Sequence, residues 1–425
     1  MKRITAAFLN NQMLSGSFVS LLGSNFANVI AYMYHFILGR MLGKADYGEL
    51  AVFLSIISLF SSSYSFIGTL VVKFVSKEAT QEKGLEVFER ILKLLTKPAL
   101  FLSLIFFAIV LFTDQLNIHL LTAALIPPIM FVSFILFLYK SYFQGTLSFA
   151  KLNFYTIFEL LLRLIFGLLF VFLGMKAGGA ALGFFISVAL LVFFAYTKTA
   201  PKKTHEKPLQ LGRFFSSETL PILVSSVCTT AFFTVDVLLV RSYFSAADSG
   251  SYAAAATLGK TVLFSTLPIT AVLFPLISRK HSEGSSGTLI LLTSLVLTTL
   301  VGGAFSLIFY FFPDLAVNIL YGSSFSDTVP LMFPYGIFML LLVLSLVFTN
   351  YYLPREKYVP IGLLLLGSVA QVIGVVLFHG TLLTVLWVSI IVTLALFSSL
   401  LVYFCYENWA IRHYLSKAFG SSPRV

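Results

Sequence analysis

Long, unbroken apolar runs recur along the chain, and they constrain its fold more than any other feature of the sequence. A transmembrane helix needs about 20 mostly apolar residues. Twelve runs of this kind are present, at residues 15–39, 47–73, 98–113, 120–143, 152–174, 177–198, 214–242, 250–276, 288–311, 328–352, 358–378 and 382–406. The runs are continuous, whereas the strands of a membrane β-barrel alternate apolar and polar residues. We therefore predict an all-α polytopic membrane protein with about twelve transmembrane helices.

The composition excludes most other classes of protein. Hydrophobic residues make up 58% of the chain and charged residues 11%, too few to coat a water-soluble fold of this length. This excludes a soluble enzyme, a disordered protein and a nucleic-acid binder, in spite of the net charge of +11. Cys228 and Cys405 lie inside apolar runs and the six histidines are scattered, so we expect neither a disulfide framework nor a metal site. No catalytic motif is recognisable, and we predict a transporter that is not an enzyme and needs no cofactor.

Lysine and arginine residues are distributed unequally between the two sides of the predicted bundle. With the N-terminus in the cytoplasm, 22 of the 28 basic residues fall in cytoplasmic segments and 4 in outer loops. Cytoplasmic loops of membrane proteins carry such an excess of basic residues. Both termini are therefore predicted to be cytoplasmic. The remaining two basic residues, Arg163 and Lys260, lie inside spans.

Two similar turns occur at equivalent places in the two halves of the chain. The turn after the first span reads RMLGKADYG at 40–48, and the turn after the seventh reads RSYFSAADSG at 241–250. The interval from each final glycine to the serine that ends the next span is 28 residues, at an offset of 202. The Lys- and Pro-rich segment 198–212 is typical of a linker. We therefore predict two parallel six-helix lobes, residues 1–205 and 206–425, as in transporters that rock one half against the other.

The same turns carry a resemblance to a known family. The patterns G-R-x-L-G-x-A-D-Y-G at 39–48 and V-D-V-L-L-V-R…A-D-S-G-S-Y-A-x-A at 235–255, with the twelve-span layout, resemble the polysaccharide biosynthesis family. Its members are lipid-linked oligosaccharide flippases (Wzx-type) of the multidrug/oligosaccharidyl-lipid/polysaccharide (MOP) exporter superfamily. The resemblance implies a MOP- or MATE-like fold around a central cavity, in the cytoplasmic (inner) membrane. It also implies export of an undecaprenyl-pyrophosphate-linked glycan to the outer leaflet, usually coupled to an ion gradient. Both H⁺ and Na⁺ stay open as the coupling ion.

The partners that this resemblance implies are an anionic lipid-linked glycan and membrane lipids, with polysaccharide assembly proteins as further candidates. Two other functions stay open at this point. One is a multidrug exporter of the same superfamily, although the first span has no carboxylate to receive a cationic drug. The other is a membrane glycosyltransferase, ligase or polymerase acting on the same lipid carrier. Such enzymes generally need sizeable outer loops, and the outer loops here are short.

Two basic residues lie deep inside predicted spans, where ionisable residues usually face a bundle interior or a wet cavity. Arg163 is about 18 Å from the inner end of its span and Lys260 about 15 Å from the outer end of its span. We predict that both bind a pyrophosphate group, since arginine can chelate it bidentately and lysine supplies a point charge. The alternatives are an intrahelical pair of Arg163 with Glu159, four residues earlier, and a partner for Lys260 on another span.

Three carboxylates are candidates for ion coupling, namely Glu159 in the fifth span and Glu218 and Asp236 in the seventh. Glu218 and Asp236 are 18 residues apart, so they share one helical face at a separation of roughly 27 Å. Carboxylates at the two ends of a polar stripe could carry a proton or a sodium ion across the membrane. Alternatively, Glu218 is a charge at a helix N-terminus, and Asp236 forms a structural pair with Arg241 or Lys260.

The first span carries a polar stripe of Asn25, Asn28, Tyr32 and His35 on one helical face. We predict that Asn25, Asn28 and His35 line the wall of a sugar-binding cavity. Packing between helices is the alternative, because amide side chains often join transmembrane helices.

Two arginines occupy equivalent outer positions in the repeated turns. We predict that Arg40 and Arg241 guide the anionic head group outward. The alternative is that they anchor the turns through Asp46 and Asp248.

Overall fold

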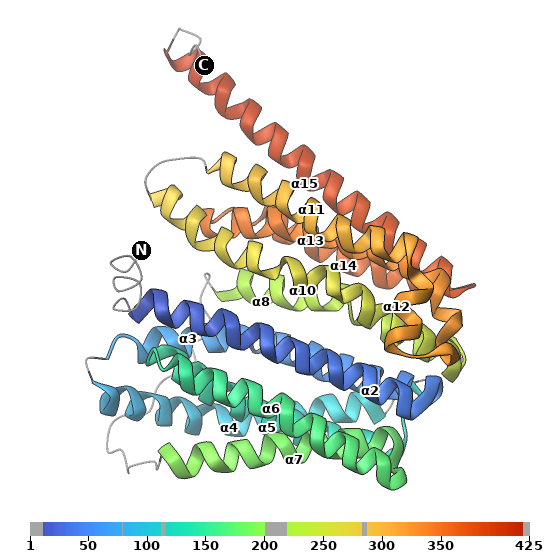
Figure 1. Cartoon of the computed structure of the whole chain (residues 1–425). Coiled ribbons are helices and arrows are strands. Elements are labelled where there is room, and N and C mark those ends of the chain that lie inside the picture. Colours follow the sequence, from blue (N-terminus) through green and yellow to red (C-terminus); the bar gives the residue numbers. More distant parts are fainter. Residues whose placement is uncertain (1–11, 79, 112–115, 200–218, 283–286, 420–425) are drawn as a thin grey trace, which may run out of the picture. The chain divides into compact units, whose positions relative to one another are not determined.

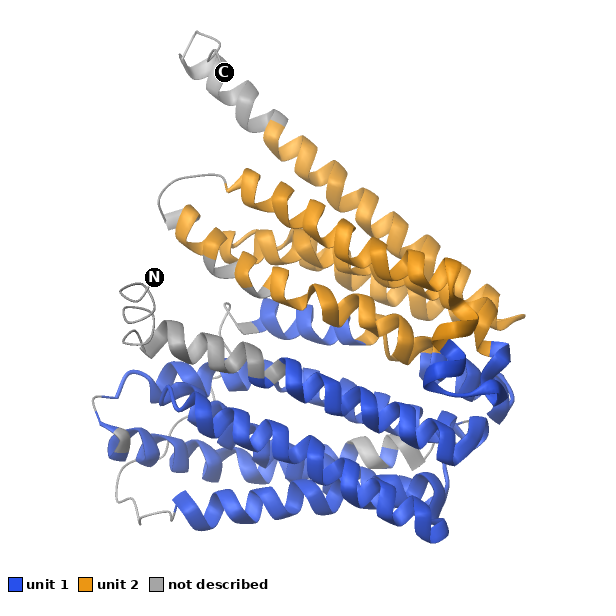
Figure 2. Cartoon of the chain, in the orientation of Figure 1, with its two compact units in different colours: residues 1–230, 237–254, 317–327 blue, residues 231–236, 255–316, 328–425 orange. Residues whose placement is uncertain are grey.

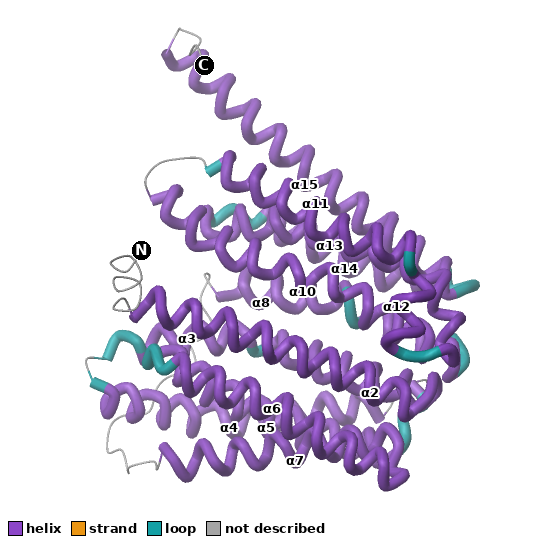
Figure 3. The backbone as a smooth tube through the Cα atoms, in the orientation of Figure 1, coloured by secondary structure: helices purple, strands orange, loops and turns teal. Residues whose placement is uncertain are grey.

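The computed structural model describes residues 12–78, 80–111, 116–199, 219–282 and 287–419, and every regular element within these ranges is helical (Figures 1 and 3). The predicted all-α fold is therefore confirmed. The predicted division between residues 205 and 206 lies outside the described residues.

Helices long and apolar enough to cross a membrane make up most of the described chain. Seven of them are found in the described residues, or eight if the pair Leu220–Phe232 and Val235–Tyr243, bent by 41°, counts as one span. The continuous runs Asn25–Ser63 and Phe149–Thr199 each take in more than one predicted span. A multi-pass membrane protein is thus supported, and the count of twelve stays a prediction.

The chain divides into two compact units (Figure 2). Unit 1 comprises residues 1–230, 237–254 and 317–327, and unit 2 comprises residues 231–236, 255–316 and 328–425. Unit 1 takes in all or most of α2 (Gln12–Ser63), α3 (Ser65–Val75), α4 (Gln81–Leu111), α5 (Leu120–Gly145), α6 (Phe149–Phe170), η2 (Val171–Met175), α7 (Lys176–Thr199), α8 (Thr219–Phe232) and α9 (Val235–Tyr243).

The helix α10 (Ala246–Ser282) begins in unit 1 and continues into unit 2. Unit 2 further contains all or part of α11 (Thr288–Phe311), α12 (Pro313–Leu320), η4 (Ser323–Thr328), α13 (Val329–Tyr352), η5 (Leu353–Arg355), α14 (Val359–Leu377) and α15 (Leu382–Phe419). Large apolar side chains are exposed on its long helices, among them Leu300, Leu366 and Val402. Such surfaces suit contact with lipid.

Glycines allow the chain to reverse between consecutive helices of unit 1. Gly43 has φ 70° and interrupts α2, and Gly174 has φ 85° between α6 and α7. Side chains with a Cβ atom rarely adopt such angles, so glycine is the residue that permits these turns.

The two copies of the repeated turn lie against each other in unit 1. A Cβ atom on Gly48 would be 2.9 Å from the backbone nitrogen of Gly250, and one on Gly250 would be 1.9 Å from the carbonyl oxygen of Lys44. The two glycines therefore let the backbones of α2 and α10 touch, which no larger residue would allow. The repeat that the sequence displays at an offset of 202 thus becomes a direct backbone contact.

A buried carboxylate on α2 completes the start of α5. Glu49 is 4% exposed, and its Oε1 accepts hydrogen bonds from the backbone N–H of His119 (3.1 Å) and from the hydroxyl of Thr122. His119 is the N-cap of α5, and its own side chain makes no capping bond. The first N–H groups of a helix lack partners within it and attract negative charge. Glu49 therefore supplies from another helix the cap that α5 lacks.

We expect Glu49→Ala to destabilise the protein by about 1–3 kcal/mol, because it leaves buried donors at the start of α5 unpaired. Thermal unfolding of the detergent-solubilised protein measures this change. Glu356→Ala, which removes an exposed carboxylate that follows η5, is the control and should leave the midpoint in place. Equal midpoints for the two variants would contradict the capping role.

Candidate functional site

Arg163 is an interior cation of unit 1 that lies between two aromatic rings. Its Cζ atom is 4.5 Å from the ring centre of Tyr34 on α2 and 4.1 Å from that of Phe184 on α7. Cations bind to the faces of aromatic rings, and more strongly where water is excluded. The Nε atom of Arg163 has no hydrogen-bond partner among the described residues. The guanidinium is thus held by the two rings and by a hydrogen bond with the Tyr34 side chain, and its Nε keeps hydrogen-bonding capacity.

Small residues bring these three helices together. A Cβ atom on Gly183 would be 2.4 Å from the backbone nitrogen of Gly167, so α6 and α7 are in close backbone contact. A Cβ atom on Gly167 would be 2.9 Å from the Tyr34 ring, and the Tyr34 hydroxyl donates a hydrogen bond to the carbonyl of Ala180 (3.4 Å). Glycines at helix interfaces permit such close packing in membranes. They place the two rings around Arg163.

Glu159 pairs with a different helix from the one its spacing suggests. Its carboxylate forms an ion pair with Lys140 of α5, and the two side chains are 18% and 20% exposed. The structure therefore pairs Glu159 with Lys140 and not, as the spacing of four residues allows, with Arg163. An ion-coupling role for Glu159 would involve breaking this pair.

Lys260 and Asp236 interact in unit 2. Asp236 is 1% exposed, accepts a hydrogen bond from the hydroxyl of Tyr335 on α13 (2.7 Å), and acts electrostatically on Lys260 of α10. The Lys260 ammonium is 5.4 Å from the ring centre of Phe233. A Cβ atom on Gly259 would be 2.2 Å from the Tyr335 ring, so this glycine lets α13 approach beside Lys260. The pairing of Asp236 with Lys260 stays a prediction.

The break between α8 and α9 positions Asp236 in the first turn of α9. A carboxylate there is favoured by the positive end of the helix dipole. The carbonyl of Phe232 at the break accepts a hydrogen bond from Gln371 Nε2 (3.2 Å), which also bonds to Ser389 (2.9 Å). Broken helices persist in membranes where neighbours satisfy the freed backbone groups in this way.

Arg241 is engaged by backbone carbonyls of unit 1. It is 4% exposed and donates to the carbonyls of Leu116 (3.2 Å), Asn117 (2.8 Å) and Ala45 (3.4 Å). Asp248 instead accepts a hydrogen bond from the Ser245 hydroxyl (2.7 Å). Arg241 thus anchors the turn through carbonyls, and the carboxylates of Glu49 and Asp46 act electrostatically on it. A contact with a substrate would require these bonds to break.

Arg40 is exposed and donates to the carbonyls of Asn318 (3.3 Å) and Ile319, in the last turn of α12. Asp46 lies 3.5 Å from Lys176 in an ion pair. An anchor through Asp46 is therefore not what holds Arg40. Arg40 therefore contacts residues 317–327, which belong to unit 1.

The polar stripe on the first span is only partly open. Asn25 is exposed, and Asn28 and His35 are half-buried. His35 Nδ1 lies 3.1 Å from the hydroxyl of Tyr47, so this histidine is engaged with the following turn. Glu218 lies outside the described residues.

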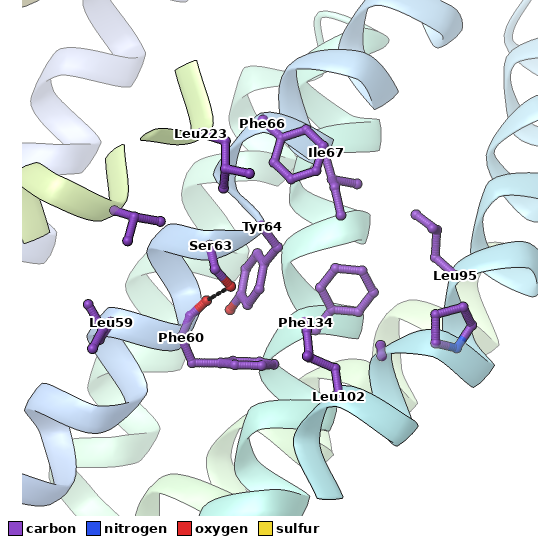
Figure 4. A pocket seen from close by; sticks show the side chains of 13 residues that line it. Leu59, Phe60, Ser63, Tyr64, Phe66, Ile67, Leu95, Leu102, Phe134 and Leu223 are labelled. Atoms are coloured by element: carbon purple, nitrogen blue, oxygen red, sulfur yellow. Dashed lines mark hydrogen bonds between the residues drawn. The ribbon is translucent and has the colours of Figure 1, made fainter. Parts of the chain in front are cut away.

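An apolar cavity of about 550 Å³ lies in unit 1 where α2 gives way to α3 (Figure 4). Phe60, Tyr64, Pro98 and Phe134 are among the residues that line it, from α2, the break, α4 and α5. The hydroxyl of Ser63 in this lining donates to the carbonyl of Phe60 (2.6 Å). Such a lining suits hydrocarbon and offers nothing to a charged head group. Within the described ranges, no group of three His, Cys, Asp or Glu residues could hold a metal ion.

Comparison with known proteins gives one family match and several structural ones. The family described as "Polysaccharide biosynthesis protein" matches residues 13–281. No curated protein matches the sequence.

Three solved structures illustrate the fold. "Lipid II flippase MurJ, inward closed conformation" has a TM-score of 0.70 at 15% identity, covering 90% of this chain and 87% of that chain. An inward-facing multidrug resistance MATE family transporter of the MOP superfamily scores 0.62 at 16% identity, covering 91% and 96%. A MOP superfamily transporter from Pyrococcus furiosus Vc1 scores 0.56 at 14% identity, covering 94% and 95%. The chain shares the two-lobed fold of these transporters.

Proposed function

Because the chain belongs to the polysaccharide biosynthesis protein family, we propose that it is a flippase for a polyprenyl-pyrophosphate-linked oligosaccharide. It works by alternating access in the cytoplasmic membrane, with both termini in the cytoplasm. The two lobes, residues 1–205 and 206–425, rock against each other. The similarity in fold to a protein named as a lipid II flippase supports a lipid-linked glycan as the substrate.

The observation that carries this proposal is the state of Arg163. Its intrahelical neighbour Glu159 is paired with Lys140, and the guanidinium lies between the rings of Tyr34 and Phe184 with its Nε unsatisfied. A charged side chain inside a transmembrane helix costs free energy, and such residues usually have a functional role. Each phosphate of a pyrophosphate offers two oxygen atoms that the planar guanidinium can bind bidentately. Arg163 is therefore the residue we assign to the anionic head group in unit 1.

Lys260 and Asp236 supply the second part of the proposal. While Asp236 is ionised, its charge compensates that of Lys260. When Asp236 takes up a proton, the Lys260 ammonium loses its counter-charge and favours an anion instead. Uptake of a proton and binding of a pyrophosphate then reinforce each other, so the ion moves in the same direction as the glycan. A sodium ion at Asp236 would act in the same direction.

We expect Arg163→Met to slow translocation of the lipid-linked glycan by about 30-fold or more, since losing a hydrogen-bonded charge contact costs about 2 kcal/mol. The measurement uses proteoliposomes loaded with a fluorescent lipid-linked oligosaccharide, whose sugar becomes accessible to an external lectin once flipped. Arg163→Lys keeps the positive charge but lacks the planar, bidentate donors of the guanidinium, and it should retain part of the translocation rate.

Lys151→Met is the matched control, because Lys151 is an exposed cation on the same helix that also faces a ring, 5.9 Å from the centre of Phe143. It should leave the rate unchanged. Full activity of Arg163→Met would remove this site assignment. A wild-type protein that moves cationic dyes but no glycan would replace the proposal with multidrug export.

A further inference from the structure

A short segment of the second half of the chain is part of unit 1. Residues 317–327, which we call the strap, comprise the end of α12 and most of η4. Residue 316 before the strap and residue 328 after it both belong to unit 2 (Figure 2). The chain therefore passes from unit 2 into unit 1 for eleven residues and then returns to unit 2.

The strap is held on α2 by a buried aromatic cluster. The ring centre of Tyr321 lies 5.6 Å from that of Phe36, 5.3 Å from that of Tyr47 and 5.1 Å from that of Phe325. Tyr321 is 1% exposed, and its hydroxyl is 2.7 Å from that of Tyr47. A Cβ atom on Gly39 would be 2.6 Å from the Tyr321 ring, so this glycine provides the space that the ring fills.

Charged contacts surround this cluster. Arg40 donates to two carbonyls in the last turn of α12, the end of a helix that attracts cations. Lys44 forms an ion pair with Asp327, which is 67% exposed. Exposed ion pairs are individually weak and screened by salt. A buried apolar centre with a solvated polar rim is the usual anatomy of a contact between two protein surfaces.

We propose that the strap is a releasable latch, seated on unit 1 in one state of the transport cycle and detached in the other. The inference rests on the proposed flippase function, because it assumes alternating states. Both ends of the strap continue into α11 and α13 of unit 2, so any motion of these helices relative to unit 1 pulls on the strap. The latch then holds one state until that pull exceeds the strength of its contacts.

A reversible cross-link tests the latch. Lys44→Cys and Asp327→Cys are introduced together after Cys228→Ala and Cys405→Ala, and a short bis-methanethiosulfonate reagent joins the new thiols. We expect the joined protein to lose at least about nine-tenths of its glycan translocation and to recover it when a reductant removes the link. Undiminished translocation in the joined protein would overturn the proposal.

The matched control joins Asp46→Cys to Lys176→Cys with the same reagent. This exposed pair, 3.5 Å apart in the native protein, connects α2 to α7 within unit 1 and does not involve the strap. It should leave translocation unchanged. Equal inhibition by the two links would mean that the reagent, and not the strap, is responsible, and would also overturn the proposal.

A second measurement does not depend on the substrate. Val317 is fully buried in the strap, so a Val317→Cys thiol should react slowly with a membrane-impermeant maleimide. Adding Arg40→Ala and Lys44→Ala should speed this labelling about five- to tenfold, because weaker contacts raise the detached population. Faster labelling supports the latch even if the protein moves no glycan, and unchanged labelling contradicts it. The two readouts thus separate failure of the latch from failure of the proposed function.

Discussion

Replacing Lys260 by methionine should lower glycan translocation by about 100-fold and reduce the amount of folded protein. The change leaves the carboxylate of Asp236, which is 1% exposed, with the hydroxyl of Tyr335 as its neutral donor. Removing one member of a buried charge pair costs about 3–5 kcal/mol, since the other charge stays buried without compensation. Translocation in proteoliposomes and the thermal midpoint are measured together, because the first reports function and the second the buried charge.

The double variant Lys260→Met with Asp236→Asn separates these two effects. It removes both charges, so the thermal midpoint should return towards that of the wild type. Translocation should stay low and lose its dependence on an imposed proton or sodium gradient. Lys280→Met, near the end of the same helix, serves as the control and should change neither quantity. A double variant that translocates normally would show that the pair is structural and would exclude both residues from the transport chemistry.

Gly250→Ala is expected to abolish stable folding. The new methyl group would lie 1.9 Å from the carbonyl oxygen of Lys44, and this oxygen belongs to the backbone, so no side chain can rotate to relieve the clash. Overpacking costs typically about 1–3 kcal/mol and more where the backbone must move. The expected results are a sharply lower thermal midpoint and little protein in the membrane fraction.

The variants Gly48→Ala and Gly303→Ala serve as comparisons for the loss of stability in Gly250→Ala. Gly48 faces the same contact at 2.9 Å and should lose less stability, whereas a Cβ atom on Gly303 of α11 would meet nothing within 4 Å. Gly303→Ala should be neutral or slightly stabilising, because alanine favours a helix by up to about 1 kcal/mol over glycine. A midpoint for Gly250→Ala equal to that of Gly303→Ala would disprove the backbone contact between the repeated turns.

Much of the fold follows from the sequence because its signals are local. Each of the twelve apolar runs is mainly helical where the structure describes it, with breaks at Tyr64 and between Phe232 and Val235. The repeated turns were detectable because glycine is needed at a close backbone approach, and Gly48 and Gly250 meet in the structure. The break at Tyr64, inside the second predicted span, carries no proline and was not predicted. The sequence did not reveal the pairing of Glu49 with Thr122 or of Lys140 with Glu159. The two residues of each pair lie on different helices.

The sequence by itself determined which segments are helical, where charged residues occur along them, and which family the chain belongs to. These properties depend on residues a few positions apart, within the range of helical periodicity. The tertiary structure alone decided the partner of each charge. Asp236 meets Tyr335 ninety-nine residues away, and Arg241 meets the carbonyl of Leu116 at a separation of 125. Such pairs depend on which helices pack together, and spacing along a single helix does not specify that packing.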